Sequence, residues 1–372
     1  MKILVSVVGI GLGHATRSEA IVKSLEKQGD SVKIITWGDA YEFFKKKGYN
    51  VSDTGGYDYK GQEYTFSVML NVLDSFRDPT KLKRDYYQFV KLADEFKPDK
   101  VVSDTDPNAF YYSHRRNLKN YMLSNLPTTI NNYERIPKSL RTNDLMMQHF
   151  MVKRLMDFIA KRTHKIFVPS FESKVRYEEN VRYTDLVIRK RSGELPPEDK
   201  LRIKMGIPDE FYLVTVGGSE IEKPLFGVLR NVLPQFKNKR FIVSSNNVTT
   251  KIEKTKNMII VPFIPNILEY LKISKGVIAP AGHSTISEAI CYQKPILAIP
   301  LRNHVEQLVN AALVEKEGYG SACFLKGKIN PEEIKKGLEH FFAHEKEYQK
   351  NLSTCGLRGK GADEIANWIS RD

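Results

Sequence analysis

The chain has 372 residues, a length that predicts two domains of ordinary size rather than one core. Hydrophobic residues make up 41% of it and charged residues 27%, which excludes intrinsic disorder. The three cysteines have none of the short spacings of a metal knuckle or redox pair, which excludes a disulfide framework. Lysine and arginine exceed aspartate and glutamate by 58 to 44, and this net charge of +14 favours polyanionic partners: nucleotides, nucleic acid or an anionic membrane face.

The longest uncharged stretches, 3–16 and 120–133, are shorter than the roughly 18 residues of a membrane-spanning helix. The first ten residues could pass for a signal peptide, but a charged helical pattern follows them instead of a small-residue cleavage site. We interpret this first run as a buried strand and expect the protein to be cytoplasmic.

The N-terminal half alternates β-rich apolar runs with helical patterns. Residues 2–8 are nearly all apolar, as in a strand covered on both faces of a parallel sheet. Short connections between successive elements indicate parallel, right-handed topology. Strands are expected over 2–8, 31–36, 100–103 and 165–169, the last being the final strand of this domain, and helices over 16–27 and 41–47.

The pattern restarts after a charged, proline-bearing segment, 183–208, which we interpret as a linker. We predict two doubly wound, Rossmann-like α/β domains whose carboxyl strand edges face a central cleft. The first is residues 1–182 and the second residues 209–350, while a C-terminal helix within 351–372 crosses back to the first domain. Strands of the second domain are expected over 211–216, 240–244, 258–261, 276–279 and 295–299, a helix over 225–236 and terminal helices over 332–371.

A glycine-rich turn, 9–14, stands between the first strand and helix, where backbone N–H groups and the helix N-terminus favour an anion. A nicotinamide cofactor is disfavoured, because the second strand does not end in the acidic residue of the dinucleotide fingerprint. His14 either caps the helix entry or acts as a base at the mouth of the cleft, and its position favours the base. Arg17, one turn later, meets either phosphate or water.

The C-terminal half of the chain also has turns between a strand and a helix that could bind an anion. The turn 217–219 either wraps a diphosphate oxygen or is an ordinary βα turn. Ser284 or Thr285 can cap a helix whose free N–H groups face the cleft. Glu288 follows on the same face, where its two oxygens can accept both hydroxyls of a ribose, although a capping box fits the same spacing.

Glu306 and Gln307 follow a later strand and suit sugar hydroxyls, or else form a solvated helix start. In this order the motifs resemble those of the GT-B nucleotide-sugar glycosyltransferases. The closest branch is that of MurG, the bacterial N-acetylglucosaminyltransferase that completes lipid II, and the plant galactolipid synthases. The resemblance covers both halves and is carried by 11–14, 217–219, 262–265, 281–288 and 306–315.

The resemblance implies a donor site for a UDP-sugar, with uracil against Ile264, the ribose on Glu288 and His14 at the reacting centre. His283 stands where the bacterial relative has small residues, and this difference suggests an added phosphate contact. The acceptor residues of the family's N-terminal domain have no counterpart here. The full implied donor site is Gly11, Gly13, Arg17, Gly218, Ser219, Phe263, Ile264, His283, Ser284, Thr285, Glu288, Glu306 and Gln307.

Asp104 and Asp106 have the spacing of a metal-binding carboxylate pair. A helix N-terminus and glycine-turn amides can stabilise a leaving diphosphate without a metal. We therefore interpret the pair as acidic residues in the cleft, one of which orients His14 or is itself the base, and a metal role is the alternative. The family likeness implies an inverting transfer of a hexose or N-acetylhexosamine, without a metal or other cofactor.

Residues 133–165 carry eight Lys or Arg against three acids, interleaved with apolar residues at near-helical spacing. A helix within 140–162 either lies on the anionic inner face of a membrane, which suits a lipid-linked acceptor, or packs in the core. Two other functions stay open. One is a UDP-sugar hydrolase or epimerase of the same fold. The other is a nucleic-acid-binding protein, which the lack of stacking aromatics and recognition-helix signatures disfavours.

Overall fold

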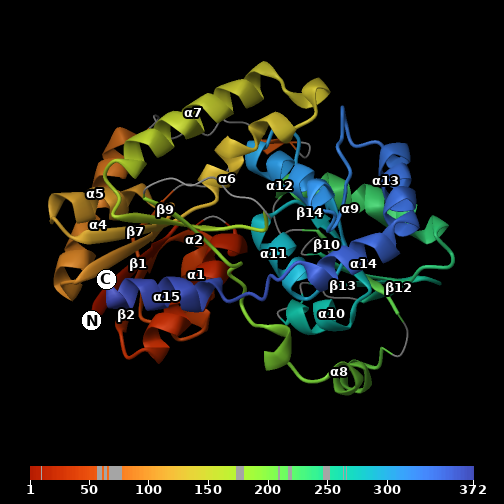
Figure 1. The fold of residues 1–372 in the computed structure, drawn as a ribbon, viewed down its shortest axis with the longest axis horizontal. Helices are drawn as coiled ribbons and strands as arrows, with labels where there is room; N and C mark the ends of the chain where they lie inside the picture. Colours follow the sequence, from red (N-terminus) through yellow and green to blue (C-terminus); the bar gives the residue numbers. More distant parts are fainter. Residues whose placement is uncertain are drawn as a thin grey trace.

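The computed structural model describes residues 1–372 except 10, 57–60, 63–64, 67–77, 173–179, 208–209, 217–219, 246–251, 263 and 265. The described chain forms two lobes, each built on a seven-stranded sheet, and a separate two-stranded hairpin, β4 (Gly61–Gln62) and β5 (Thr65–Phe66) (Figure 1). The predicted fold, two doubly wound α/β halves, is confirmed.

The sheet of the N-terminal lobe is entirely parallel, in the order β3-β2-β1-β6-β7-β8-β9. Three of its strands, β3, β7 and β9, were not predicted. Because β9 follows β8 in the sheet, the strand over 165–169 is not the last of this domain. The strands are β1 (Lys2–Val7), β2 (Ser31–Thr36), β3 (Val51–Asp53), β6 (Lys100–Asp104), β7 (Lys119–Leu123), β8 (Lys165–Pro169) and β9 (Val181–Thr184).

Helices cover both faces of this sheet. On one face, α1 packs with the C-terminal helix α15 (Gly361–Arg371) around Ile3 and Val5. On the other face, Phe89 of α4 and Ala109 of α5 pack against Leu4 and Val101 of the sheet. The helices of this lobe are α1 (Leu12–Lys27), α2 (Gly38–Lys46), α4 (Pro79–Phe96), α5 (Pro107–Arg115), α6 (Leu126–Asn131) and α7 (Asn143–Ala160).

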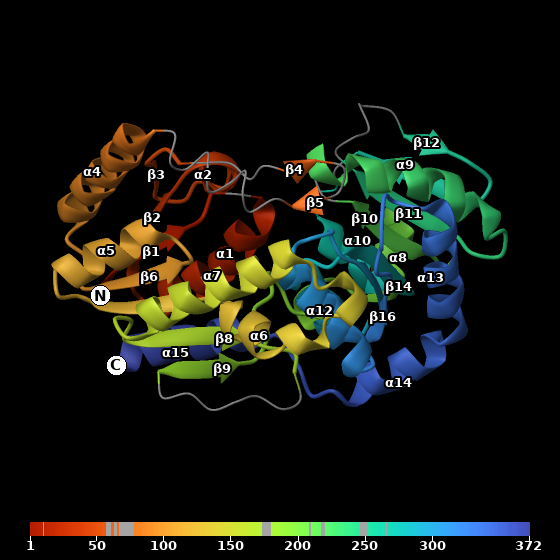
Figure 2. The ribbon, with the colours of Figure 1, turned by 90° about the horizontal axis from the view of Figure 1, so that it is seen from above.

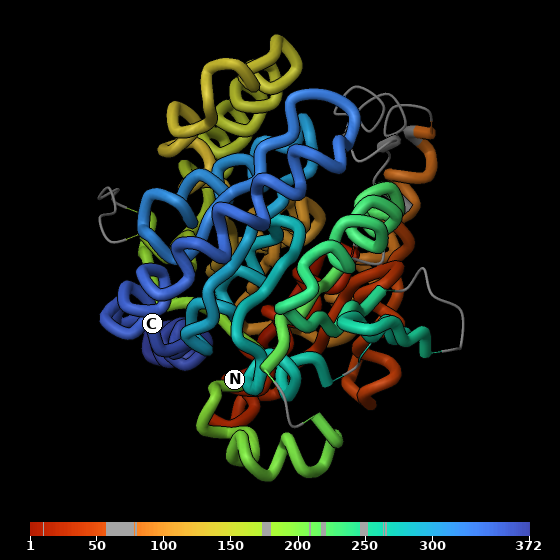
Figure 3. Tube along the Cα trace, turned by 90° about the vertical axis from the view of Figure 1, so that its right-hand side faces the viewer, coloured from red at the N-terminus to blue at the C-terminus, as the bar shows by residue number. Residues whose placement is uncertain are grey.

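The sheet of the C-terminal lobe has the order β12-β13-β11-β10-β14-β15-β16, parallel except for β12. Figure 3 looks onto this lobe, with α9 and the pair α13 and α14 toward the viewer. The strands are β10 (Tyr212–Val216), β11 (Phe241–Ser245), β12 (Glu253–Lys254), β13 (Met258–Val261), β14 (Gly276–Pro280), β15 (Ile296–Ile299) and β16 (Gly320–Ala322). The helices are α8 (Glu198–Met205), α9 (Lys223–Val232), α10 (Ile267–Ile273), α11 (His283–Cys291), α12 (Val305–Lys316), α13 (Pro331–Ala343) and α14 (Glu345–Thr354).

The chain passes between the lobes twice, and the two crossings touch. The predicted linker begins within β9 and contains helix α8, so much of it is regular structure. The second crossing leads from α14 to α15 (Gly361–Arg371), which returns to the N-terminal lobe as expected (Figure 2). A Cβ atom on Gly361 would lie 2.0 Å from the backbone oxygen of Asp185, so only glycine allows this approach.

Contacts between the lobes come from the carboxyl edges of both sheets. Gly13 follows β1 and Pro169 ends β8, and both accept hydrogen bonds from the start of α11, which follows β14. Asn125 follows β7 and donates to Glu306, in the first turn of α12. Loops at this edge therefore bring together residues more than 100 positions apart. Among the described residues, none of the helices combines the length and apolar character needed to cross a bilayer.

Candidate active site where the two lobes meet

Helix α1 begins four residues earlier than predicted, so that His14 lies in its first turn. Gly11 precedes the helix with φ +67°, a left-handed conformation that glycine adopts without strain. The backbone N–H of Gly11 donates to Oδ2 of Asp39, in the first turn of α2, at 3.1 Å. The backbone N–H of Gly11, which was predicted to contact the donor, is therefore already hydrogen-bonded to the carboxylate of Asp39.

His14 and Asp104 form a hydrogen-bonded pair. Nδ1 of His14 lies 2.8 Å from Oδ1 of Asp104, the last residue of β6. Nη2 of Arg17, which can only donate, lies 3.0 Å from the same nitrogen. Because the contact with the carboxylate is the shorter of the two and a carboxylate only accepts, we assign the proton to Nδ1, which leaves Nε2 to accept on the side of the ring away from Asp104. The His14 side chain is 26% exposed, whereas that of Asp104 is 2% exposed. The predicted role of one aspartate, to orient His14, therefore has a geometric basis in Asp104.

Arg17 is directed at Asp104 and not at the solvent. Its Nε donates to Asp104 Oδ2 at 2.7 Å, its Nη2 to Oδ1, and Ser18 Oγ donates to Oδ2 at 2.8 Å. Burial raises the pKa of Asp104, but the charges and hydrogen bonds of Arg17 and His14 together outweigh it and hold this pKa well below its usual range. The phosphate contact considered for Arg17 is not what the structure shows, because the guanidinium is buried against this carboxylate.

Asp106 lies apart from the cluster of His14, Arg17 and Asp104 and has partners of its own. It is the N-cap of α5, where Oδ1 accepts from the backbone N–H of Asn108 at 2.9 Å and Oδ2 accepts from Ser6 Oγ. Burial raises the pKa of Asp106 to about 6. Its carboxylate is therefore committed to a structural role, and this placement does not support the catalytic role considered for it.

The start of α11 carries three predicted residues. Ser284 Oγ donates to the backbone oxygen of Gly13 at 3.1 Å, and Thr285 stands beside it in the first turn. His283 is buried, with Nε2 3.1 Å from the backbone oxygen of Pro169, and burial lowers its pKa to about 4. Because Nε2 is bonded to Pro169 and Nδ1 lies 3.3 Å from Ser287 Oγ, the placement of His283 does not support the phosphate contact considered for it.

Glu288 has a partner that sequence reasoning missed. Arg189, in the first crossing between the lobes, donates to Oε1 of Glu288 through Nε at 2.6 Å and to Oε2 through Nη2 at 2.9 Å. Such a bidentate pair fixes the carboxylate but leaves each oxygen a second lone pair. A ribose diol would have to share Glu288 with this guanidinium. Nothing in the sequence near Arg189 marks it as this partner.

Of the residues predicted to contact the base or to form the diphosphate turn, the structure describes only Ile264. The backbone N–H of Ile264 donates to Ser244 Oγ at 3.3 Å, and Ile264 is 9% exposed. Gly218, Ser219 and Phe263 lie outside the described residues.

Glu306 and Gln307 lie in the first turn of α12, beside the N-terminal lobe. Glu306 Oε1 accepts from Asn125 Nδ2 at 3.4 Å, and Gln307 Oε1 accepts from the backbone N–H of Leu301 at 2.9 Å. Burial raises the pKa of Glu306, but the neighbouring His304, Arg17 and His14 more than offset it, so the pKa lies below its usual range. Glu306 therefore carries negative charge at neutral pH.

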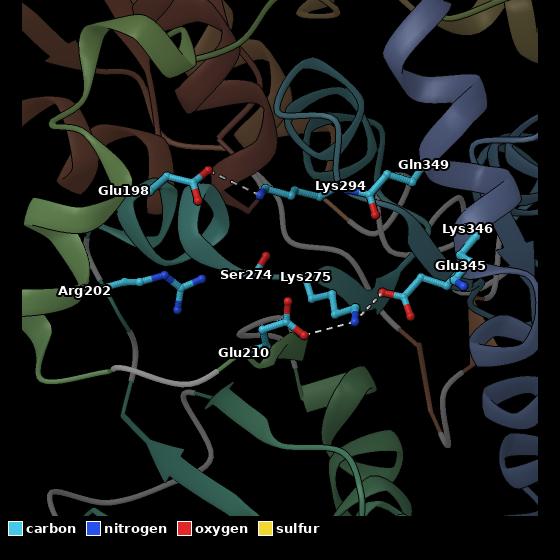
Figure 4. Close-up of a pocket in the computed structure, with 9 residues that line it drawn as sticks. All are labelled: Glu198, Arg202, Glu210, Ser274, Lys275, Lys294, Glu345, Lys346 and Gln349. Atoms are coloured by element: carbon cyan, nitrogen blue, oxygen red, sulfur yellow. Dashed lines mark hydrogen bonds and ion pairs between the residues drawn. The ribbon is translucent and has the colours of Figure 1, made fainter.

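A pocket at the opposite edge of the C-terminal sheet has a volume of about 380 Å³ (Figure 4). Its charged groups pair with one another. Nζ of Lys275 lies 3.0 Å from Glu210 and 3.8 Å from Glu345, and Nζ of Lys294 lies 3.7 Å from Glu198. Because doubly wound sheets bind ligands at the carboxyl ends of their strands, we place the active site at the lobe boundary and not in this pocket. In the described part of the chain, no three His, Cys, Asp or Glu side chains are grouped to hold a metal ion.

Comparison with known proteins shows the family and the fold of this chain. The model of glycosyl transferase family 1 matches residues 1–341. The chain is 27% identical, over 86% of its length and 85% of the relative's, to a Methanosarcina mazei protein described as an uncharacterized glycosyltransferase. It is 26% identical, over 100% and 99%, to the UDP-N-acetylglucosamine--N-acetylmuramyl-(pentapeptide) pyrophosphoryl-undecaprenol N-acetylglucosamine transferase of Clostridium botulinum.

Solved structures share the fold. MurG of Acinetobacter baumannii superimposes with a TM-score of 0.64 at 13% identity, over 100% of this chain and 99% of that one. The spinosyn rhamnosyltransferase SpnG, complexed with thymidine diphosphate, gives 0.69 at 12% identity over 100% of both chains. The chain therefore belongs to glycosyl transferase family 1 and is a glycosyltransferase of the GT-B fold.

Proposed function

We propose that this glycosyltransferase moves a hexose or N-acetylhexosamine from a UDP-sugar to a lipid-linked acceptor, with inversion and without a metal. The observation that carries the proposal is the junction of two helix starts. The hydrogen bond between Ser284 and Gly13 sets the first turn of α11 beside the turn that holds His14. A base and an anion-binding helix terminus then stand at one lobe boundary.

The donor would lie along the C-terminal lobe. The free N–H groups at the start of α11, with Ser284 and Thr285, would hold the diphosphate, because a helix N-terminus carries partial positive charge. Glu288 would accept from the ribose beside Arg189, and Glu306 with Gln307 would contact the sugar. The uracil would lie against Phe263 and Ile264, and Gly218 and Ser219 would add diphosphate contacts. The donor named for the Clostridium relative and the nucleotide bound to SpnG support this class of donor.

The chemistry requires a base on the acceptor side. Nε2 of His14 would take the proton of the acceptor hydroxyl while that oxygen bonds to C1 of the sugar. The bond from C1 to the diphosphate oxygen breaks on the opposite face, and UDP leaves with the electron pair. Asp104 holds the imidazole in the tautomer that this step needs. General-base catalysis of this kind contributes about 10²–10⁴-fold to the rate.

Helix α7 would place the enzyme on the membrane that carries the lipid-linked acceptor. Arg154 and Arg162 lie over the rings of Phe150 and Phe158 at 5.4 and 4.0 Å. Such a basic and apolar face suits an anionic bilayer, and the lipid carrier named for the Clostridium relative supports a lipid-linked acceptor. The exposed apolar side chains of this face, each at least 40% exposed, are Met146, Met147, Phe150, Met151, Leu155 and Phe158.

The test is a panel of UDP-sugars incubated with the protein and a lipid extract, in the presence of EDTA. Sugar transfer to lipid, with the anomeric configuration inverted, is the expected result. Complete turnover of a UDP-sugar without acceptor would instead indicate a hydrolase or an epimerase. If UDP, UDP-sugars and GDP all leave the melting temperature unchanged, the proposed donor site is wrong, since a ligand at 100 times Kd should stabilise by about 2.7 kcal/mol.

A further inference from the structure

Gln148, on α7, reaches from the N-terminal lobe into the loop that precedes α12. Its side chain is buried, and Gln148 is 3% exposed. Nε2 donates to the backbone oxygen of Asn303 at 2.6 Å and to Asp144 Oδ2 at 2.9 Å, while Oε1 accepts from the backbone N–H of Val305 at 3.3 Å. Only one orientation of the amide satisfies two acceptors and one donor, so its hydrogen bonding is fully specified.

The backbone of the loop before α12 needs hydrogen-bond partners from outside the loop. Asn303 has φ +53°, the left-handed conformation, which asparagine adopts more readily than other side chains with a Cβ atom, and it marks a tight turn before α12. Val305 is the first residue of α12, and its N–H is among those that a helix cannot satisfy internally. Gln148 therefore accepts from the first N–H of a helix of the other lobe and bonds to the backbone on both sides of His304, the N-cap of that helix.

The same loop carries the residues proposed to contact the donor sugar. His304 Nδ1 accepts from the backbone N–H of Gln307 at 3.4 Å, and Gln307 Oε1 accepts from Leu301. These bonds tie the direction of the first turn of α12 to the shape of the loop. A shift at Asn303 would therefore be passed on to Glu306 and Gln307.

We propose that Gln148 is a positioning residue for the sugar end of the donor. While Gln148 of the N-terminal lobe is bonded to the loop before α12, the loop holds Glu306 and Gln307 toward the sugar. When this contact between the lobes is lost, the two side chains lose that direction. The inference rests on the proposed function, which assigns those two residues to the sugar. Nucleotide binding is assigned to α11 and to the segment around Ile264, so Gln148 should affect the sugar-bearing donor and leave UDP alone unaffected.

The test compares Gln148→Met, which keeps the volume and removes all three hydrogen bonds, with Asp157→Asn, an exposed change on the same helix. We expect Gln148→Met to raise the KM for the UDP-sugar by about tenfold, with UDP affinity within twofold of wild type. Peptide-resolved hydrogen exchange over 299–308 should become faster. Asp157→Asn should change none of these. Gln148→Glu, which keeps the acceptor and loses both donors, replaces Gln148→Met if the latter does not fold.

Unchanged hydrogen exchange in the loop, or faster exchange with an unchanged KM, would overturn the inference. An equal loss of UDP and UDP-sugar affinity would also overturn it, because it would indicate a general disturbance of the donor lobe. If the wild-type protein binds no UDP-sugar, the proposed function fails. The exchange measurement on the free protein then still decides whether Gln148 holds the loop.

Discussion

Ser284 Oγ donates to the backbone oxygen of Gly13 at 3.1 Å, so that the first turns of α11 and α1 meet although 271 positions separate the two residues. Helix N-termini carry partial positive charge, and two of them at one boundary attract an anion between the lobes. The carboxylate of Asp39 already accepts from Gly11 at the start of α1. The start of α11 therefore remains the better place for a diphosphate.

Replacement of His14 tests the proposed base. His14→Ala should bind UDP with near-normal affinity and lose about 10²–10⁴-fold in transfer rate, because only the proton acceptor is removed. Titration calorimetry with UDP and initial rates with the best donor would measure the two effects. Undiminished transfer would exclude His14 from the mechanism.

The two aspartates provide a matched comparison. Asp104→Asn replaces one of the two acceptor oxygens with an NH₂ donor and leaves Arg17 and His14 without the negative charge that holds them, so we expect a loss in kcat of at least about 100-fold. Asp106→Asn can still cap α5 and should keep nearly all activity. Melting temperatures of both variants separate chemistry from folding. Equal activity losses would contradict the different roles assigned to the two carboxylates.

The role of Glu288 can be tested by removing the charge of Glu288 itself or that of its partner Arg189. Glu288→Gln should weaken UDP binding by about tenfold, because a neutral amide is a weaker partner for the ribose hydroxyls. Arg189→Met leaves a buried carboxylate without its cation and should lower the melting temperature. The measurements are UDP titration and thermal unfolding. Wild-type UDP affinity in Glu288→Gln would remove Glu288 from the ribose site.

The stability of the protein should depend on pH through His283. Its pKa is about 4 in the folded state, against an ordinary value of 6.5. The unfolded chain therefore binds a proton between pH 6.5 and 4 that the native state rejects, and the free energy of unfolding falls as the pH falls. Asp106, whose pKa is raised to about 6, acts in the opposite sense over an overlapping range.

A comparison with His283→Asn isolates the His283 contribution, because Asp106 is present in both proteins. The difference in unfolding free energy between wild type and variant should shrink by roughly 2 kcal/mol from pH 7 to pH 5. Urea unfolding at the two pH values measures it. A difference that does not change with pH would refute the assignment of a buried neutral imidazole.

The proposed membrane face makes a separate prediction. The double substitution Phe150→Ser and Leu155→Ser should reduce sedimentation with vesicles rich in anionic lipid, because two exposed apolar side chains are lost from α7. Activity on a water-soluble acceptor should not change. Ile203→Ser, a change on α8 at a side chain that is 82% exposed, provides the control for loss of an exposed apolar side chain elsewhere on the surface. Unaltered vesicle binding would show that α7 is not the docking face.

Much of the fold follows from local pattern. The strands β1 and β14 are almost wholly apolar runs followed by turn residues, and both were predicted from that pattern. The strand β7, whose sequence is KNYML, mixes polar and apolar residues and was missed. The helix α8 was hidden in a charged segment, because few of its side chains are buried and its apolar spacing is weak.

The site was only partly predictable. The spacing of Asp104 and Asp106 could not tell them apart, although Asp106 before Pro107 has the pattern of a helix N-cap. The partners of Glu288 and of the loop before α12 depend on how distant segments pack. Arg189 and Gln148 therefore carry no local signal in the sequence.

The most direct measurement is hydrogen exchange of the whole protein with and without UDP, in EDTA. The account predicts slower exchange in peptides that cover 281–288, with a second protected segment at 11–17 in the other lobe. Protection confined to 198–202, 274–275 and 345–349, the segments around the pocket in Figure 4, would contradict it, as would no protection at saturating UDP.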